Sequence, residues 1–158
     1  MKRIVKVDFF SESKKWPRRI PKIKGIVFKT IKIMRKYFDK NYFINLNLIF
    51  SDKKRVRKLN FQYKKKHEDT DVLTFVTKTS NKNLGNHLHC DIFFSIDTIE
   101  NFIKNKNINI YDHFNHLLIH SILHINGYDH KNLIQFNKMK KEEIKIMRKF
   151  GLQDPYIY

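Results

Sequence analysis

The sequence predicts an α+β fold, with a small mixed β-sheet of about four strands and helices packed on it. Three observations support this prediction. Some short segments alternate apolar with polar residues, which is typical of strands, and other segments repeat apolar residues at helical spacing. Strand-like and helix-like segments are interspersed along the chain, which favours one layered core. The chain has 158 residues, 41% of them hydrophobic, which suits one domain over residues 1–158.

The first half predicts two strands and two helices. Trp16-Pro17 interrupts the first alternating segment, and Pro21 opens an amphipathic basic pattern that ends near Phe38. Ser51 or Asp52 stands where a helix cap is expected. In order, we expect a strand at 2–10, a helix at 21–38, a strand at 42–50 and a short basic helix through 59–63.

The second half predicts two strands and three helices. Asp97 is a candidate N-cap, and Gly127 and Gly151 follow the last residues of two helical patterns, as C-terminal glycines do. In order, we expect a strand at 71–76, a polar loop at 77–87, a strand at 88–96 and helices at 97–102, 111–126 and 132–150. The predicted order is therefore β-α-β-α-β-β-α-α-α.

The positive charge is concentrated in the first part of the chain. Residues 1–66 contain 22 of the 33 Lys and Arg but only 4 of the 15 acids, whereas residues 67–158 contain 11 of each. Such asymmetry favours a polyanionic partner, most simply nucleic acid. The absence of Ala and the abundance of Lys, Asn, Ile and Phe also indicate drift toward an AT-rich coding sequence, which does not by itself explain the asymmetry.

Other features narrow the class of protein. The single cysteine, Cys90, excludes an intrachain disulfide framework. No segment approaches the ~20 consecutive apolar residues that span a bilayer, and charges interrupt the apolar N-terminal segment, so a signal peptide is not expected. We therefore expect a cytoplasmic protein.

Five of the eight histidines lie between residues 113 and 130. His120 and His124 are four residues apart, so they lie on one face of the predicted helix. Gly127 allows a left-handed turn that returns His130 to the same place. Three imidazoles leave the fourth position of a tetrahedral ion open, which is the pattern of catalytic zinc. The sequence thus predicts a one-ion site on a central helix and the turn that follows it.

Residues near the three histidines have other expected roles. His116 lies on the same helix face as His120 but one helical turn further from the chain reversal at Gly127, so His130 reaches it less easily. We therefore expect His113 and His116 in supporting or surface positions. The same histidine spacing occurs in metzincin proteases, but these need Glu directly after the first histidine, where this chain has Ser121. A peptidase is therefore disfavoured. Asp129 is interpreted as a turn residue, or else as one that orients a histidine or handles a proton.

Three segments resemble the YbeY family of endoribonucleases. HSILHINGYDH at 120–130 is similar to the family's HGxLHLxGYDH, and LNFQYKKKHEDTDVLTFV at 59–76 is similar to LNxxYRxxxxxTDVLSFP. CDIFFSIDTIE at 90–100 is similar to the family's GDIxIxxDT. The resemblance implies a zinc-dependent, single-strand-specific endoribonuclease that matures ribosomal RNA, notably the 3′ end of the small-subunit RNA, and acts in ribosome quality control. It also implies contact with the small ribosomal subunit and with assembly factors such as the GTPase Era.

The resemblance places Lys64 where the family has arginine. Lysine lacks the bidentate fork that arginine offers phosphate oxygens, so either Lys64 acts less well, Lys65 or Lys66 shares the role, or activity is weakened. Cys90, Ser121, Asn126 and Val76 are further departures. Thr70-Asp71 is expected to shape the pocket, and Cys90 to be a small buried residue. An alternative interpretation is a ribosome-assembly factor that binds RNA and keeps the metal but has weakened chemistry.

Overall fold

The structure is a computed structural model that describes residues 5–157. Its strands are β1 (Val5–Ser11), β2 (Phe43–Ser51), β3 (Val72–Asn81) and β4 (Gly85–Ser95). They form one sheet in the order β1-β2-β4-β3, with β1, β2 and β4 parallel and β3 antiparallel to β4. The helices are α1 (Lys15–Arg19), α2 (Ile23–Met34), the 3-10 turn η1 (Arg35–Tyr37), α3 (Lys53–Lys64), α4 (Ile96–Ile103), α5 (Ile110–Ile125) and α6 (Leu133–Arg148). The prediction of an α+β fold with a small mixed sheet is confirmed.

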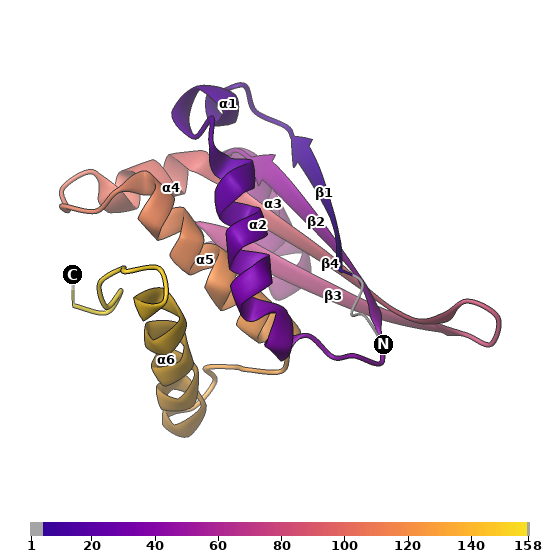
Figure 1. Cartoon of the computed structure of the whole chain (residues 1–158). Coiled ribbons are helices and arrows are strands. Elements are labelled where there is room, and N and C mark those ends of the chain that lie inside the picture. Colours follow the sequence, from indigo (N-terminus) through magenta and orange to yellow (C-terminus); the bar gives the residue numbers. More distant parts are fainter. Residues whose placement is uncertain (1–4, 158) are drawn as a thin grey trace.

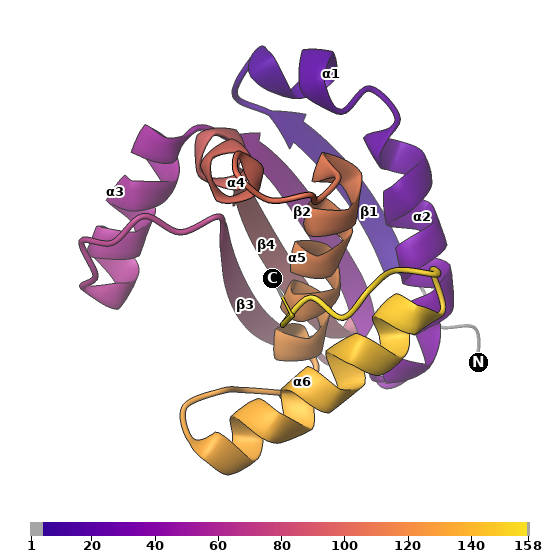
Figure 2. The same cartoon turned by 90° about the vertical axis from the view of Figure 1, so that its left-hand side faces the viewer.

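One face of the sheet carries the main core. Helices α2 and α5 lie on this face (Figure 1), and α6 passes across the C-terminal end of α5 (Figure 2). Alternate residues of β2 and β4 point into the core because successive side chains of a strand face opposite sides. These residues are Ile44, Leu46, Leu48, Phe50, Leu88, Cys90, Ile92 and Phe94.

Helix α3 packs on the other face of the sheet and forms a smaller apolar cluster there. Val56 and Leu59 of the helix meet Leu73 of β3, with Phe75 and Phe93 partly buried beside them. Figure 2 shows α3 on the opposite side of the sheet from α5. No helix within residues 5–157 combines the length and the apolar composition needed to cross a bilayer.

The loop predicted at residues 77–87 is wrong. β3 continues to Asn81 and β4 begins at Gly85, so the two strands form a hairpin that projects from the sheet (Figure 1). The last six residues of β3 are exposed. Backbone ladder bonds extend the strands beyond the core, joined by polar side-chain contacts such as Ser80 Oγ to Asn86 Oδ1 at 2.7 Å. Such an extension shows no apolar alternation in the sequence.

Several element boundaries also differ from the prediction. Trp16-Pro17 lies within the short helix α1, where Pro17 is tolerated because backbone N–H groups in a first helical turn have no partner. The N-cap of α4 is Ser95, whose Oγ accepts from Thr98 N, and Asp97 lies in the first turn instead. Of the two candidates before α3, Asp52 is the cap. The part of the first predicted strand before Val5 lies outside the described residues.

Candidate metal centre

His120, His124 and His130 come together at the C-terminal end of α5. His120 and His124 lie one helical turn apart, with ring centroids separated by 4.5 Å. The ring centroid of His130 lies 5.4 Å from that of His120 and 4.9 Å from that of His124. One ligand atom from each residue lies within 4.8 Å of the others, so the three imidazoles are close enough to share one ion.

The turn after α5 carries His130 back to the helix. Gly127 has a φ of +88°, a left-handed conformation that glycine adopts without steric cost. Its N–H donates to the His124 carbonyl at 3.0 Å, and the N–H of Tyr128 donates to the Leu123 carbonyl at 3.1 Å. These bonds end the helix in the way that C-terminal glycines do.

Hydrogen bonds fix the Nδ1 atoms of two histidines. His124 Nδ1 lies 2.9 Å from the Tyr128 carbonyl oxygen, and His120 Nδ1 contacts Glu143 Oε1. A carbonyl and a carboxylate only accept, so both Nδ1 atoms carry a proton. Burial lowers the pKa of His124 to about 4, and the proximity of His120 and His130 adds to this effect, so it is neutral at pH 7.

The two Nε2 atoms that remain face each other at 3.0 Å. With Nδ1 protonated, the Nε2 atom of a neutral imidazole presents a lone pair. Two lone pairs at this separation repel unless a proton or a metal ion lies between or beside them. The donor set therefore fits a metal ion, and a third imidazole stands next to it.

Glu143 of α6 supports this arrangement from within the protein. Its side chain has no exposed surface and accepts from His116 Nε2 at 3.1 Å, from His120 Nδ1 and from the Tyr156 hydroxyl. Burial acts to raise the pKa of Glu143, but the hydrogen bonds from His116 and His120 outweigh it and lower the pKa to about 2. The carboxylate thus stays charged and orients the ring of His120.

A cleft opens in front of the histidines between α3, β3, α5, α6 and the C-terminal segment. Lys64 and Lys66 line it, whereas Lys65 adopts a left-handed conformation and turns its ammonium group onto the Gln62 carbonyl of its own helix. Desolvation in the cleft and the positive charge of Lys66 lower the pKa of Lys64. Two lysines therefore face the same space as the histidines.

The chain is similar to known proteins along most of its length. A sequence model of the family described as Endoribonuclease YbeY matches residues 9–151. The chain belongs to the endoribonuclease YbeY family. Endoribonuclease YbeY of Ehrlichia chaffeensis is 34% identical over 149 residues, which cover 91% of this chain and 92% of that protein. The Ehrlichia canis protein is 36% identical over the same shares. The resemblance found in the sequence is confirmed.

A solved structure gives a likeness of fold alone. The solution structure of a Thermotoga maritima protein matches with a TM-score of 0.52 and 21% identity, covering 98% of this chain and 100% of that one.

The structure also shows the contacts of the other candidate residues in this YbeY-family chain. His113 Nε2 lies 3.1 Å from Asp71 Oδ2 and its ring stacks on Phe102, and Thr70 and Asp71 line the cleft. Asp129 accepts from the backbone N–H of His130 at 2.8 Å and pairs with Lys131, which are contacts of a turn residue.

The departures from the YbeY pattern at Cys90 and Ser121 lie in the core. Cys90 is fully buried on the inner face of β4, and burial raises its pKa to about 12. Ser121 is also fully buried, and its hydroxyl is the one buried side-chain polar atom within residues 5–157 that lacks a hydrogen-bond partner. The bulk that serine adds is thus accommodated without any new polar contact.

Sequence reasoning missed Glu143 and Tyr156. A signal for Glu143 was present, because it falls in the buried stripe of α6 with Met139, Ile146 and Met147. A single acid at helical spacing among apolar core residues indicates a partnered buried carboxylate. Tyr156 lies in the segment after the last helix, and its partner becomes visible only in the folded chain.

Proposed function

We propose that the chain is a metal-dependent endoribonuclease that holds one zinc ion at His120, His124 and His130. The observation that carries the proposal is the pair of Nε2 atoms that face each other at 3.0 Å. Family membership supports it, since the curated relatives are named endoribonucleases. Imidazole nitrogen suits zinc, and copper, iron and nickel bind the same type of ligand, so the choice of zinc belongs to the proposal.

The residues of the cleft have different roles in this proposal. Zinc held there would supply a Lewis acid and an acidified water for attack on a phosphodiester. Glu143 and the Tyr128 carbonyl keep the Nε2 atoms of His120 and His124 directed at the ion. Lys64 and Lys66 offer positive charge where negative charge grows on the phosphate in the transition state. Lysine acts there as a point charge without bidentate contacts.

The substrate in this proposal is single-stranded ribosomal RNA, with the 3′ end of the small-subunit RNA and ribosome quality control as the biological setting. The small subunit and assembly factors such as the GTPase Era are the proposed partners, in the cytoplasm. The family resemblance and the +18 net charge support this choice, because a basic protein attracts polyanions.

Cleavage of a single-stranded rRNA fragment by the purified protein tests the proposal. We expect zinc-loaded protein to cut the RNA, and either chelation or His124→Ala to abolish the cleavage. His89→Asn is the matched control, because His89 is an exposed imidazole on β4, outside the cleft-lining residues. Cleavage that persists in His124→Ala would contradict the ligand assignment.

The same assay separates the alternative function. A protein that binds the RNA and retains zinc, yet cuts nothing at any metal concentration, would be an RNA-binding assembly factor with weakened chemistry. This alternative is motivated by Lys64, which stands where the family has arginine.

A further inference from the structure

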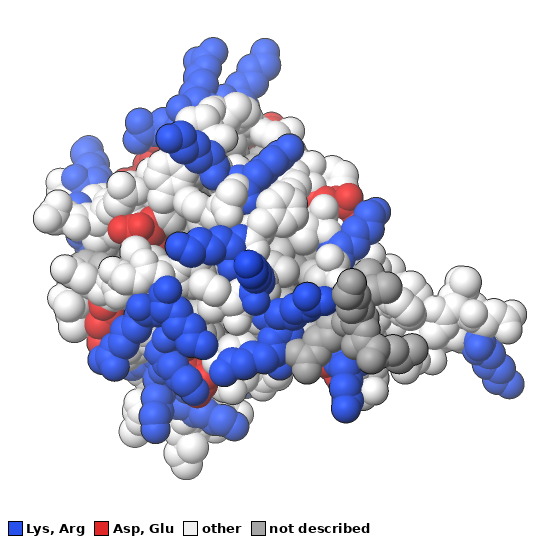
Figure 3. All heavy atoms as spheres, viewed as in Figure 1, with Lys and Arg blue, Asp and Glu red and all other residues white. Residues whose placement is uncertain are grey.

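Basic residues are numerous on α1, α2 and the C-terminal end of α6, at positions outside the cleft-lining residues. Residues 13–38 contain ten Lys and Arg and no acid, and they form α1, α2 and η1. Figure 3 shows Lys and Arg gathered over α1, α2 and α6, with few acids among them. The helices that carry this charge come from opposite ends of the chain.

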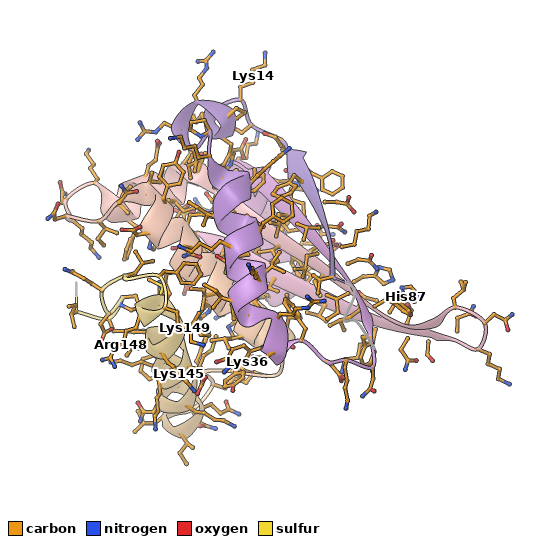
Figure 4. All side chains as sticks on the ribbon, in the orientation of Figure 1. Lys14, Lys36, His87, Lys145, Arg148 and Lys149 are labelled. Atoms are coloured by element: carbon orange, nitrogen blue, oxygen red, sulfur yellow. The ribbon has the colours of Figure 1, made fainter. Side chains whose placement is uncertain are left out.

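Packing joins η1 and α2 to the end of α6. The Tyr37 hydroxyl of η1 donates to Glu142 Oε2 of α6 at 2.6 Å, and Lys29 Nζ lies 5.4 Å from the ring centroid of Phe150. Figure 4 shows Lys36 close to the basic end of α6. We name this exposed surface the α2–α6 ridge; its residues are Lys29, Lys32, Lys36, Lys145, Arg148 and Lys149.

Few carboxylates neutralise the ridge. Among its residues, within the described part of the chain, only Lys145 has an ion pair, with Glu142 at 3.7 Å. Some basic residues elsewhere are paired, as Lys15 is with Asp97 and Lys53 with Asp69. An uncompensated cluster of cations costs free energy through mutual repulsion, and a row of phosphates would relieve this repulsion.

A short segment separates the ridge from the cleft. Phe150 contacts Lys29 on the ridge side. The residues that follow it, Gly151, Leu152 and Tyr156, line the cleft that contains His120. An extended strand held at the histidines therefore has to cross only this segment to reach the ridge.

We propose that the α2–α6 ridge binds the phosphate backbone of the RNA strand that the cleft cuts, outside the cleavage site. This inference rests on the proposed endoribonuclease function and adds a second binding surface to it. An anionic membrane is disfavoured, because α2 buries Val27, Thr30 and Met34 against the core and so has no complete apolar face to insert.

RNA binding by metal-free protein tests the ridge independently of cleavage. The affinity for a fluorescent single-stranded RNA is measured with chelator present at several salt concentrations. The ridge variant is K36Q/R148Q/K149Q. The control, K78Q/K82Q/K104Q, removes the same charge from exposed positions on the β3–β4 hairpin and after α4.

The ridge variant should bind about tenfold more weakly at about 0.1 M salt, and its slope of log K against log salt should shrink by up to about 2, since each lost phosphate contact removes about 0.7. The control should change affinity less than about twofold. The ridge variant should also cut a long RNA more slowly but a short RNA that fills only the cleft at the normal rate.

Three results would overturn the proposal. These are equal losses in both variants, no loss in the ridge variant, and a ridge-dependent affinity for phosphatidylglycerol vesicles without one for RNA. If the wild type binds RNA through the ridge yet never cuts it, the ridge stands and the proposed endoribonuclease function fails, so the two failures are distinguishable.

Discussion

At the residue scale, the site depends on two groups that can only accept a hydrogen bond. The Tyr128 carbonyl and the Glu143 carboxylate each hold an Nδ1–H, and this leaves the Nε2 atoms of His124 and His120 free. The tautomers are thereby set by the fold before any ion binds. Preorganised ligands of this kind are expected to bind a metal more tightly than freely rotating imidazoles.

Replacing Glu143 tests this support. Glu143→Gln keeps the shape but has one acceptor atom for three donors, His116, His120 and the Tyr156 hydroxyl. Zinc affinity, measured by competition with a chromogenic chelator, should fall roughly 10- to 100-fold. Glu142→Gln is the control, because Glu142 bonds Tyr37 instead. Equal affinities in the two variants would show that Glu143 does not position the site.

His124 predicts how acid affects the metal-free protein. Its pKa of about 4 in the folded chain lies below the ordinary value of 6.5, so the unfolded chain takes up this proton first. The stability contributed by neutral His124 is therefore complete above about pH 6.5 and is lost as the pH falls toward about 4, by roughly 1–2 kcal/mol because solvent screens a half-buried ring. Urea unfolding between about pH 7 and pH 4.5 should show a shallower dependence in His124→Asn than in His89→Asn. Identical pH profiles would refute the assignment.

Replacing Lys64 with arginine is expected to raise the activity on RNA. Lys64→Arg restores a fork that contacts two phosphate oxygens, so kcat/KM on single-stranded RNA should rise about three- to tenfold. Lys65→Arg should change little, because Lys65 bonds its own helix and lies outside the cleft. An equal gain in both variants would indicate a general effect of arginine on RNA binding.

At the scale of elements, the turn after α5 determines whether the third imidazole arrives. A Cβ on Gly127 would meet nothing within 4 Å, and its φ of +88° disfavours a side chain by conformation alone. Gly127→Ala should therefore cost about 1 kcal/mol of unfolding free energy and weaken zinc binding. Gly127→Asn should do less harm, because asparagine tolerates this region. Thermal unfolding and chelator competition measure both, and a zinc affinity that is unchanged in both variants would separate the turn from the site.

The elements that could be predicted from the sequence are those that pack on the core. Helices α2 and α5 were predictable because their apolar residues repeat at the helical period that packing requires. The outer part of the β3–β4 hairpin was not, because the last six residues of β3 are exposed and backbone bonds with a few polar side-chain contacts define it. Capping by Ser95 rather than Asp97 was hidden, since both residue types cap helices equally well.

The site was predictable to the extent that it is local in sequence. The spacing of His120, His124 and His130 placed three imidazoles together through one helix and one turn. Glu143 and Tyr156 come from α6 and the C-terminal segment, and only tertiary packing brings them to α5. The ligand set itself remains a prediction that metal analysis has to test.

At the scale of the whole molecule, α5 separates two kinds of surface. Its histidine-bearing end faces the cleft, while α2, which packs on α5, carries Lys29 and Lys32 of the ridge at exposed positions. The excess charge of residues 1–66 lies beside the cleft at Lys64 and Lys66, on α1 and α2, and also on α3 on the other face of the sheet. An RNA strand that touches both the cleft and the ridge would use the first two of these groups.

In the proposed site three histidines hold one zinc ion, and metal analysis of the untagged protein tests this most directly. We predict about one zinc per chain in the wild type and in His89→Asn, and almost none in His120→Ala, as measured by inductively coupled plasma mass spectrometry. Circular dichroism on the same samples would confirm that each variant is folded. A zinc content that is the same in His120→Ala as in the wild type would contradict the account.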